Sequence, residues 1–170
     1  MGTIYLGWIK IKNGDIAEGM SFLRSGLAAH DFARGVAWRT HFVVLLAEAW
    51  EIAGEIETAM TLVEDALQIV ERTGERWIAA ELNKQKGRLL LRQGHNDAAE
   101  EVYRKALNIA REQEAKLWEL RAALSLARLR RDQGRRGEAR DLLGPVYGWF
   151  TEGFDTPDLK EAKALLDELR

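Results

Sequence analysis

Glycine recurs at every fortieth position of this chain, and this register constrains the fold more than any other feature. The recurring glycines are Gly14, Gly54, Gly94 and Gly134. Five positions after each glycine the residue is small: Gly19, Ala59, Ala99 and Ala139. Largely apolar columns follow nine, twelve and thirteen positions after the glycine, a spacing typical of one helix face. The pattern predicts a chain of equivalent units, each with a helix after its glycine.

A second helix face precedes each glycine. Eight positions upstream the residues are mostly large: Leu6, Leu46, Lys86 and Leu126. Seven positions upstream they are small: Gly7, Ala47, Gly87 and Ala127. Because glycine suits the left-handed conformation that ends many helices, each unit is predicted to be two helices joined by a tight turn. The small residues would let the two helices approach closely.

Stacking of these hairpins predicts an all-α fold. A lone hairpin cannot bury its apolar stripe, whereas a stack of hairpins buries a continuous core. We expect a right-handed α-α superhelix, a solenoid of four 40-residue helical hairpins that forms a single domain over residues 1–170. The expected units are about 1–34, 35–74, 75–114 and 115–154, with a C-terminal capping helix at 156–169. Proline at the first helical position, Pro157, and a charged outer face suit such a cap.

The first predicted helix is about half as long as its counterparts. We therefore expect residues 1–170 to be the C-terminal part of a longer array; the alternative is a short native first helix. An array cut at this point would expose an apolar face on its first helix, and exposed apolar patches favour association. The residues of this possible homodimer face are Ile4, Tyr5, Trp8 and Ile11.

Composition narrows the classes of function. The chain has 25 basic and 27 acidic residues and a net charge of −2, which disfavours a dedicated polyanion binder. It contains no cysteine, so zinc–thiolate sites, iron–sulfur clusters and thiol nucleophiles are excluded. The longest nearly apolar run, residues 42–50, contains Glu48 and is too short to cross a membrane. No signal peptide is visible, and we expect a cytoplasmic protein.

The units resemble tetratricopeptide (TPR) repeats. The small–large–small signature of that family is matched in the second unit by Ala59, Val63, Ala66 and Leu67, and in the third by Ala99, Tyr103, Ala106 and Leu107. The period is 40 residues, against about 34 in the usual repeat, which indicates the long-helix variety. The chain departs from the family pattern at Lys86, Val146 and Tyr147.

A closer resemblance covers residues from about Glu75 to the end. The strings GERW, ELRAALSLARL, QGRRGEARDLL and PVYGWFTEGFDTPDLKEAKALLDEL are similar to the C-terminal TPR region of bacterial class III adenylate or guanylate cyclases, or of transcriptional regulators, that carry an AAA-type ATPase module. The resemblance implies a non-enzymatic, partner-binding regulatory segment of a bacterial signalling protein. No GxxxxGK[ST] phosphate loop is present in this chain.

The TPR resemblance also implies a concave groove lined by the first helix of each unit. In the C-terminal half, the family's groove-facing positions fall mainly on basic residues: Lys84, Arg88, Arg92, Arg121, Arg128 and Arg131. Because arginine suits bidentate contact with carboxylates, we expect a protein or peptide partner, and an acidic segment would fit this face. The alternative is a solvated basic face. Nucleic acid is not the expected partner, since Glu48 and Glu51 interrupt the basic strip.

Aromatic residues gather at two places. Trp38, Trp77 and Trp118 stand near the starts of successive first helices, where they are expected to pack between hairpins; a solvent-facing binding role is the alternative. A second group is expected to seal the last hairpin against the cap helix: Tyr147, Trp149, Phe150 and Phe154.

The chain offers little for catalysis. His30, His41 and His95 share no metal-ligand spacing, and none of the three serines lies in a G-x-S-x-G elbow. We therefore predict no catalytic residues, no metal site and no cofactor, and a protein that is not an enzyme. The predicted function is protein or peptide binding. The alternatives are self-association and small-molecule sensing, which would need an enclosed pocket.

Overall fold

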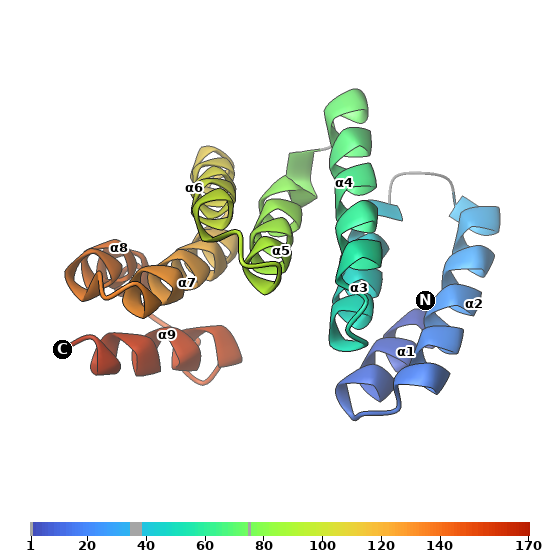
Figure 1. Cartoon of the computed structure of the whole chain (residues 1–170), viewed down its shortest axis with the longest axis horizontal. Helices are drawn as coiled ribbons and strands as arrows, with labels where there is room; N and C mark the ends of the chain where they lie inside the picture. The colour runs from blue at the N-terminus through green and yellow to red at the C-terminus, as the bar shows by residue number, and fades with distance from the viewer. Residues whose placement is uncertain (1, 35–38, 75) are drawn as a thin grey trace.

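The computed structural model describes residues 2–34, 39–74 and 76–170, with all their side chains except those of residues 27, 30–34 and 39–41. Every regular element in these ranges is a helix, and the hairpins follow one another along the molecule, with the two ends of the chain at opposite ends of the array (Figure 1). The elements are α1 (Gly2–Lys12), α2 (Ile16–Arg34), α3 (Arg39–Ile52), α4 (Ile56–Thr73), the 3-10 helix η2 (Arg76–Ile78), α5 (Ala79–Arg92), α6 (Asn96–Glu112), α7 (Lys116–Asp132), α8 (Arg136–Gly148) and α9 (Pro157–Glu168). The predicted all-α solenoid is confirmed.

The turn inside each hairpin depends on its glycine. The φ angles of Gly14, Gly54, Gly94 and Gly134 are 96°, 87°, 83° and 79°, all in the left-handed region that L-residues rarely adopt. A Cβ at these positions would meet no atom within 4 Å, so the backbone conformation and not the available space selects glycine. The forty-residue register of the sequence is therefore a register of equivalent turns.

Inside the third hairpin, a glycine makes room for an aromatic ring. A Cβ built on Gly87 of α5 would lie 2.5 Å from Cε1 of Tyr103, which is buried on α6. One unit later the equivalent residues are Ala127 and Leu143, both fully buried. The third unit thus combines a smaller residue with a larger one than the fourth unit does, so the total side-chain volume at the two positions stays similar.

The buried side chains form three clusters along the array, and α9 closes the last of them. Leu159, Ala162 and Leu165 of α9 are buried in the cluster that joins α6, α7 and α8. Helix α9 lies beside α7 and α8, in the position that the first helix of a fifth unit would take (Figure 1). Tyr147 and Phe150 pack against this cluster as predicted, but Trp149 and Phe154 are exposed.

The predicted exposed face of α1 is wrong in two of its four residues. Ile4 and Ile11 are fully buried, because Gly26 and Gly19 of α2 let that helix come against them. Tyr5 is exposed and lies edge-on to Phe42, with ring centroids 6.3 Å apart. The physical reason is that α1 turns this side toward its own hairpin partner, so the exposed apolar side of α1 is a different one.

Candidate protein-binding groove

The first helices of the hairpins and the cap helix together line one groove. It has a volume of about 550 Å³ and runs from Trp8 of α1, along α3, α5 and α7, to Asp158 and Glu161 of α9. Four of its lining residues are basic and four are acidic: Lys84, Arg88, Arg121 and Arg128 against Glu48, Glu81, Asp158 and Glu161. We call this surface the central groove.

The charge of the central groove differs from the sequence expectation. The sequence predicts a strongly basic C-terminal half, but the lining basic and acidic side chains balance. Asp158 and Glu161 come from α9, Glu48 comes from α3, and Glu81 lies on α5 with Lys84 and Arg88. A solenoid brings adjacent first helices side by side, so residues more than thirty positions apart neutralise one another.

Arg121 and Arg128 are both held by the cap helix. Arg121 donates two hydrogen bonds to Asp158, from Nε to Oδ1 at 2.8 Å and from Nη2 to Oδ2 at 2.9 Å. This bidentate contact raises the pKa of Arg121 against the opposing effect of burial. Arg128 Nη2 donates to Glu161 Oε2 at 3.0 Å, where both side chains are about half exposed. The cap therefore supplies the counter-charges of these two arginines of α7.

The middle of the groove keeps polar atoms without hydrogen-bond partners. Arg88 Nη2 lies 2.6 Å from Glu51 Oε2, a close ion pair without hydrogen-bond alignment, and Lys84 Nζ lies 2.7 Å from Glu81 Oε1. The buried Nε of Arg88 and the buried Oε2 of Glu81 have no hydrogen-bond partner. Since buried polar groups are normally satisfied, these two atoms are unsatisfied polar groups in the wall of the groove.

At the N-terminal end of the groove, Glu48 of α3 accepts hydrogen bonds from two residues of the first unit. Trp8 Nε1 donates to Glu48 Oε2 at 2.9 Å, and Lys12 Nζ donates to Glu48 Oε1 at 2.5 Å. Burial raises the pKa of Glu48, but the hydrogen bonds from Lys12 and Trp8 and the nearby positive charges outweigh it, so the pKa is lowered overall. Glu48 is thus an ionised link between α1 and α3.

Two tryptophans join the central groove to a second, open pocket. Trp77 of η2 and Trp118 of α7 lie with ring centroids 6.1 Å apart and an interplanar angle of 31°. Both rings line the groove and also a pocket of about 580 Å³, whose other lining residues include Lys116 and Leu117. The tryptophans therefore both pack between hairpins and face solvent. Trp38 lies outside the described residues, as does the side chain of His41.

The structure separates the six predicted groove residues into two groups. Lys84, Arg88, Arg121 and Arg128 line the central groove. Arg92 lies at the end of α5, and Arg131 bonds to Asp132 and Glu168; neither lines the groove. Sequence reasoning missed the acidic partners from α9. The signal available was spacing, because Arg121 and Asp158 stand almost one repeat apart.

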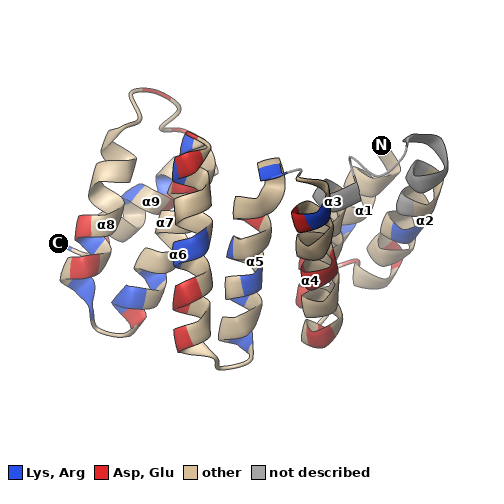
Figure 2. Ribbon diagram, turned by 90° about the horizontal axis from the view of Figure 1, so that it is seen from above, with Lys and Arg blue, Asp and Glu red and all other residues tan. Residues whose placement is uncertain are grey.

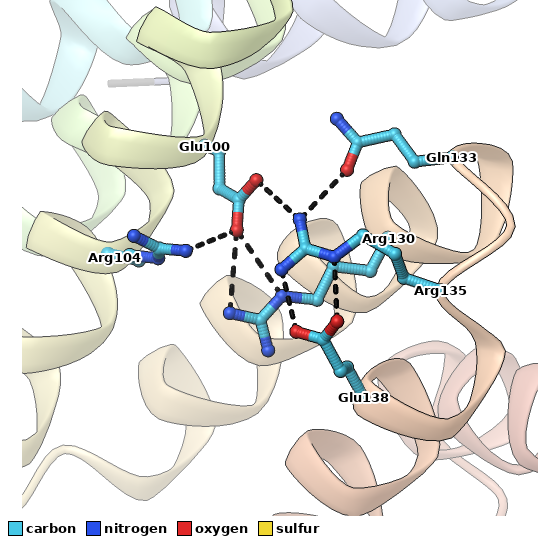
Figure 3. Close-up of polar contacts among 6 residues, drawn as sticks. All are labelled: Glu100, Arg104, Arg130, Gln133, Arg135 and Glu138. Carbon is cyan, nitrogen blue, oxygen red and sulfur yellow. Dashed lines mark hydrogen bonds and ion pairs between the residues drawn. The ribbon is translucent and has the colours of Figure 1, made fainter.

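A second charged cluster joins the third and fourth units away from the groove. Figure 3 shows the carboxylate of Glu100 on α6 facing three guanidinium groups. Its Oε1 lies 2.6 Å from Arg104 Nη2 and 3.4 Å from Arg130 Nε, and its Oε2 accepts from Arg135 Nη1 at 2.8 Å. Arg135 also donates two hydrogen bonds to Glu138, from Nε to Oε1 at 2.9 Å and from Nη2 to Oε2 at 2.6 Å. Glu100 therefore holds the turn between α7 and α8 against α6.

The other arginines of the fourth unit have internal acceptors as well. Arg131 donates to Glu168 Oε2 at 3.0 Å, Arg136 donates to the backbone carbonyl of Glu168, and Arg140 lies 3.5 Å from Asp141. Acidic and basic residues are interspersed on α6 and α8, as Figure 2 shows. The concentration of arginine in this unit is therefore matched by nearby acceptors and does not form a uniform polyanion-binding strip.

Two further properties concern only the described part of the chain. Within it, no group of three or more His, Asp or Glu side chains is placed to hold a metal ion. No helix there is both long enough and apolar enough to cross a membrane.

Comparison with known proteins supports the fold. No protein-family model and no curated protein match the sequence. Among solved structures, the chain is similar to the nearly identical TPR-like repeats of a putative kinesin light chain from Podosopora anserina, with a TM-score of 0.73 at 20% identity, covering 99% of this chain and 83% of that one. A variant of the same repeats gives a TM-score of 0.74. The chain is also similar to BtubC (BKLC) from P. vanneervenii, with a TM-score of 0.73 at 18% identity, covering 96% of this chain and 75% of that one.

The fold and the groove together define a helical-repeat protein of the TPR-like class. The similarity extends over nearly the whole chain, so it concerns the stack of hairpins and not one hairpin alone. At these identities it establishes the architecture, and the fold by itself does not specify a ligand.

Proposed function

We propose that this chain is a non-enzymatic module that binds a protein or peptide in the central groove, as a regulatory scaffold of a bacterial signalling protein in the cytoplasm. The observation that carries the proposal is the groove itself. It is an open trough, formed by every unit of the array and lined by charges of both signs and by tryptophan rings. Such surfaces suit extended or helical segments of a partner.

The basic residues best able to meet an acidic partner are Arg88 and Arg128. Their side chains are 39% and 45% exposed, the largest values among the four groove cations. Arg88 is paired with Glu51, so a partner carboxylate would bind the exposed part of the guanidinium beside that pair. Arg128 is paired only with the half-exposed Glu161, which a competing carboxylate can replace at little cost. Arg121, held bidentately, is expected to stay with Asp158.

The tryptophan pair is expected to supply affinity. Aromatic residues at the centre of an interface are frequent hot spots, and Trp77 and Trp118 offer ring surface to both the groove and the adjoining pocket. An apolar side chain of the partner would bury itself beside Leu117 in that pocket. The partner that fits best is therefore an acidic segment that also carries a bulky apolar residue.

A fluorescently labelled acidic peptide with one tryptophan and a free carboxyl terminus tests the proposal by anisotropy titration. Arg88→Glu should weaken binding by about tenfold or more, since it removes a charge-assisted contact and adds repulsion. Arg140→Glu is the matched control, because Arg140 is an exposed arginine on α8 that does not line the groove. Equal affinities of wild type, Arg88→Glu and Arg140→Glu would eliminate the central groove as the binding site.

A further inference from the structure

A separate pocket lies where α4, α5 and α6 meet, inside the second and third units. It has a volume of about 270 Å³, and its described lining residues are all different from those of the central groove. Helix α5 lies between α4 and α6 along the array (Figure 1). The apolar wall of the pocket is formed by Leu67, Val70, Ala79 and Ile109. We call it the α4–α6 pocket; its volume suits a molecule smaller than a typical drug.

Three polar residues line both the α4–α6 pocket and an adjoining cavity of about 360 Å³: Glu71, Asn83 and Lys105. Glu71 and Lys105 are exposed and opposite in charge, but within the described part of the chain neither forms an ion pair. The other charged residue of the pocket, Arg76, is paired with Glu112 at 3.2 Å. The pocket therefore offers one carboxylate and one ammonium group that no described residue neutralises.

Asn83 places a buried amide in the wall of the pocket. It is 3% exposed, and its Nδ2 donates to the backbone carbonyl of Ala79 at 2.8 Å. The residues at its position in the second and fourth units are Val43 and Ala123, so the packing of the repeat does not require a polar side chain there. No described residue donates to the side-chain oxygen of Asn83, which leaves a hydrogen-bond acceptor at the pocket.

The fourth unit shows how the same position is used when a charged side chain occupies it. Glu119, which stands where the third unit has Ala79, is 6% exposed and accepts from Arg111 Nε at 2.9 Å and from Lys116 Nζ at 2.8 Å. The residues one unit before these two cations both line the α4–α6 pocket, and one of them is Glu71. In the third unit a methyl group thus replaces a carboxylate side chain, and a carboxylate replaces one of its cations.

We propose that the α4–α6 pocket binds a free amino acid with an apolar side chain. At neutral pH such a molecule carries one carboxylate and one ammonium group, which match the two unneutralised charges of the pocket. The carboxylate pairs with Lys105, and the ammonium group pairs with Glu71 and donates to the side-chain oxygen of Asn83. The apolar side chain packs against the wall that contains Val70 and Ile109.

Titration of the isotope-labelled protein with L-leucine, followed by NMR of the backbone amides, tests the site. Concentrations from about 10 µM to about 10 mM cover the affinities expected of a small ligand. We expect saturable shifts in residues 67–71, 79–83 and 105–109. L-leucinamide lacks the carboxylate and 4-methylpentanoate lacks the ammonium group, so each should bind about threefold to tenfold more weakly than leucine. Glycine, which has no side chain to bury, should also bind more weakly.

Two exposed substitutions assign the charges of the ligand to their partners. Lys105→Gln should weaken leucine binding by about threefold to tenfold and leave leucinamide binding unchanged, since leucinamide has no carboxylate to lose. Glu71→Gln should weaken leucine binding by a similar factor and leave 4-methylpentanoate binding unchanged. Lys160→Gln and Glu101→Gln are the matched controls, because both are exposed and neither lines the pocket; both should bind leucine like wild type.

A third variant tests the apolar wall. Ala79→Leu fills space inside the pocket and should weaken all these compounds, while Arg88→Glu in the central groove should affect none of them. Circular dichroism shows whether Ala79→Leu is folded, and the two exposed substitutions test the site independently of it. No saturable shift with leucine, shifts that lie outside the three segments, or analogues that bind as tightly as leucine would overturn the proposal.

Discussion

Glu100 and Arg130 form an ion pair at a place where the earlier units of the array have apolar residues. The pair joins α6 to α7, with 3.4 Å between Glu100 Oε1 and Arg130 Nε. One unit earlier the equivalent positions hold Met60 and Leu90, which belong to the same hydrophobic cluster. At this position an ion pair therefore joins the third unit to the fourth, whereas buried apolar side chains join the second unit to the third.

Replacing one member of this pair should destabilise the protein more than replacing both. Glu100→Met leaves Arg130 and Arg135 without their shared carboxylate, and we expect a loss of about 1–3 kcal/mol, because partly buried arginines lose their counter-charge. Glu100→Met with Arg130→Leu restores the pairing of the earlier unit and should recover most of that loss. Urea unfolding gives the free energy of unfolding of the single and the double variant. Glu101→Gln, on the exposed side of α6, is the control. A double variant as unstable as the single one would contradict the equivalence of the two interfaces.

Acid should weaken the contacts between neighbouring helices. Burial raises the pKa of Glu48, Glu100 and Glu119, but hydrogen bonds and nearby positive charges outweigh it and lower the pKa overall. Carboxylates with a lowered folded-state pKa contribute stability at higher pH. That contribution is lost as the pH falls from the ordinary glutamate value of about 4.3 through the lower folded values. Unfolding free energies measured between about pH 6 and pH 3 should fall, and should fall less steeply in Glu100→Gln.

The contact of Gly87 with Tyr103 predicts a rescue experiment. Gly87→Ala places a Cβ within 2.5 Å of the buried ring, and overpacking of this kind costs about 1–3 kcal/mol. Tyr103→Leu combined with Gly87→Ala reproduces the Ala127–Leu143 contact of the fourth unit and should restore most of the stability. Thermal unfolding of the two single variants and the double variant gives the coupling energy. A coupling energy near zero would show that the two residues do not share the space.

The cap helix should depend on Asp158 more than on Glu161. Asp158→Asn breaks a bidentate contact with the half-buried Arg121, whereas Glu161→Gln weakens a single bond between two half-exposed side chains. We expect amide hydrogen exchange in α9 to accelerate about fivefold in Asp158→Asn, corresponding to about 1 kcal/mol, and to change little in Glu161→Gln. Equal acceleration in both variants would contradict the assigned role of the bidentate contact.

Much of the fold could be predicted from local patterns in the sequence. The glycine register identified the four turns, since each needs a positive φ that the chain can adopt only at particular residues. Exact helix ends were less predictable. Helix α8, for example, ends at Gly148, well before the expected end of its unit at residue 154, and a 3-10 turn precedes α5. These ends are set by packing of the neighbouring units, which the pattern of one unit does not contain.

The candidate site was less predictable, because its character comes from contacts between units. The basic positions Arg121 and Arg128 were placed in the groove, but their partners Asp158 and Glu161 stand 37 and 33 positions away on the cap helix. Two of the four residues assigned to the exposed side of α1, Ile4 and Ile11, are buried. All the isoleucines of that short helix are equally apolar, and the sequence pattern did not distinguish the buried Ile4 and Ile11 from Ile9, which is 48% exposed.

The central claim is that the chain binds its partner through the groove formed by successive first helices. Hydrogen–deuterium exchange of the protein with and without a saturating acidic, tryptophan-containing peptide tests it most directly. We predict slower exchange in α5 and α7, around residues 81–88 and 121–128, and unchanged exchange in α6 and α8. Protection confined to α6 and α8, or no protection in α5 and α7 at saturation, would contradict the account.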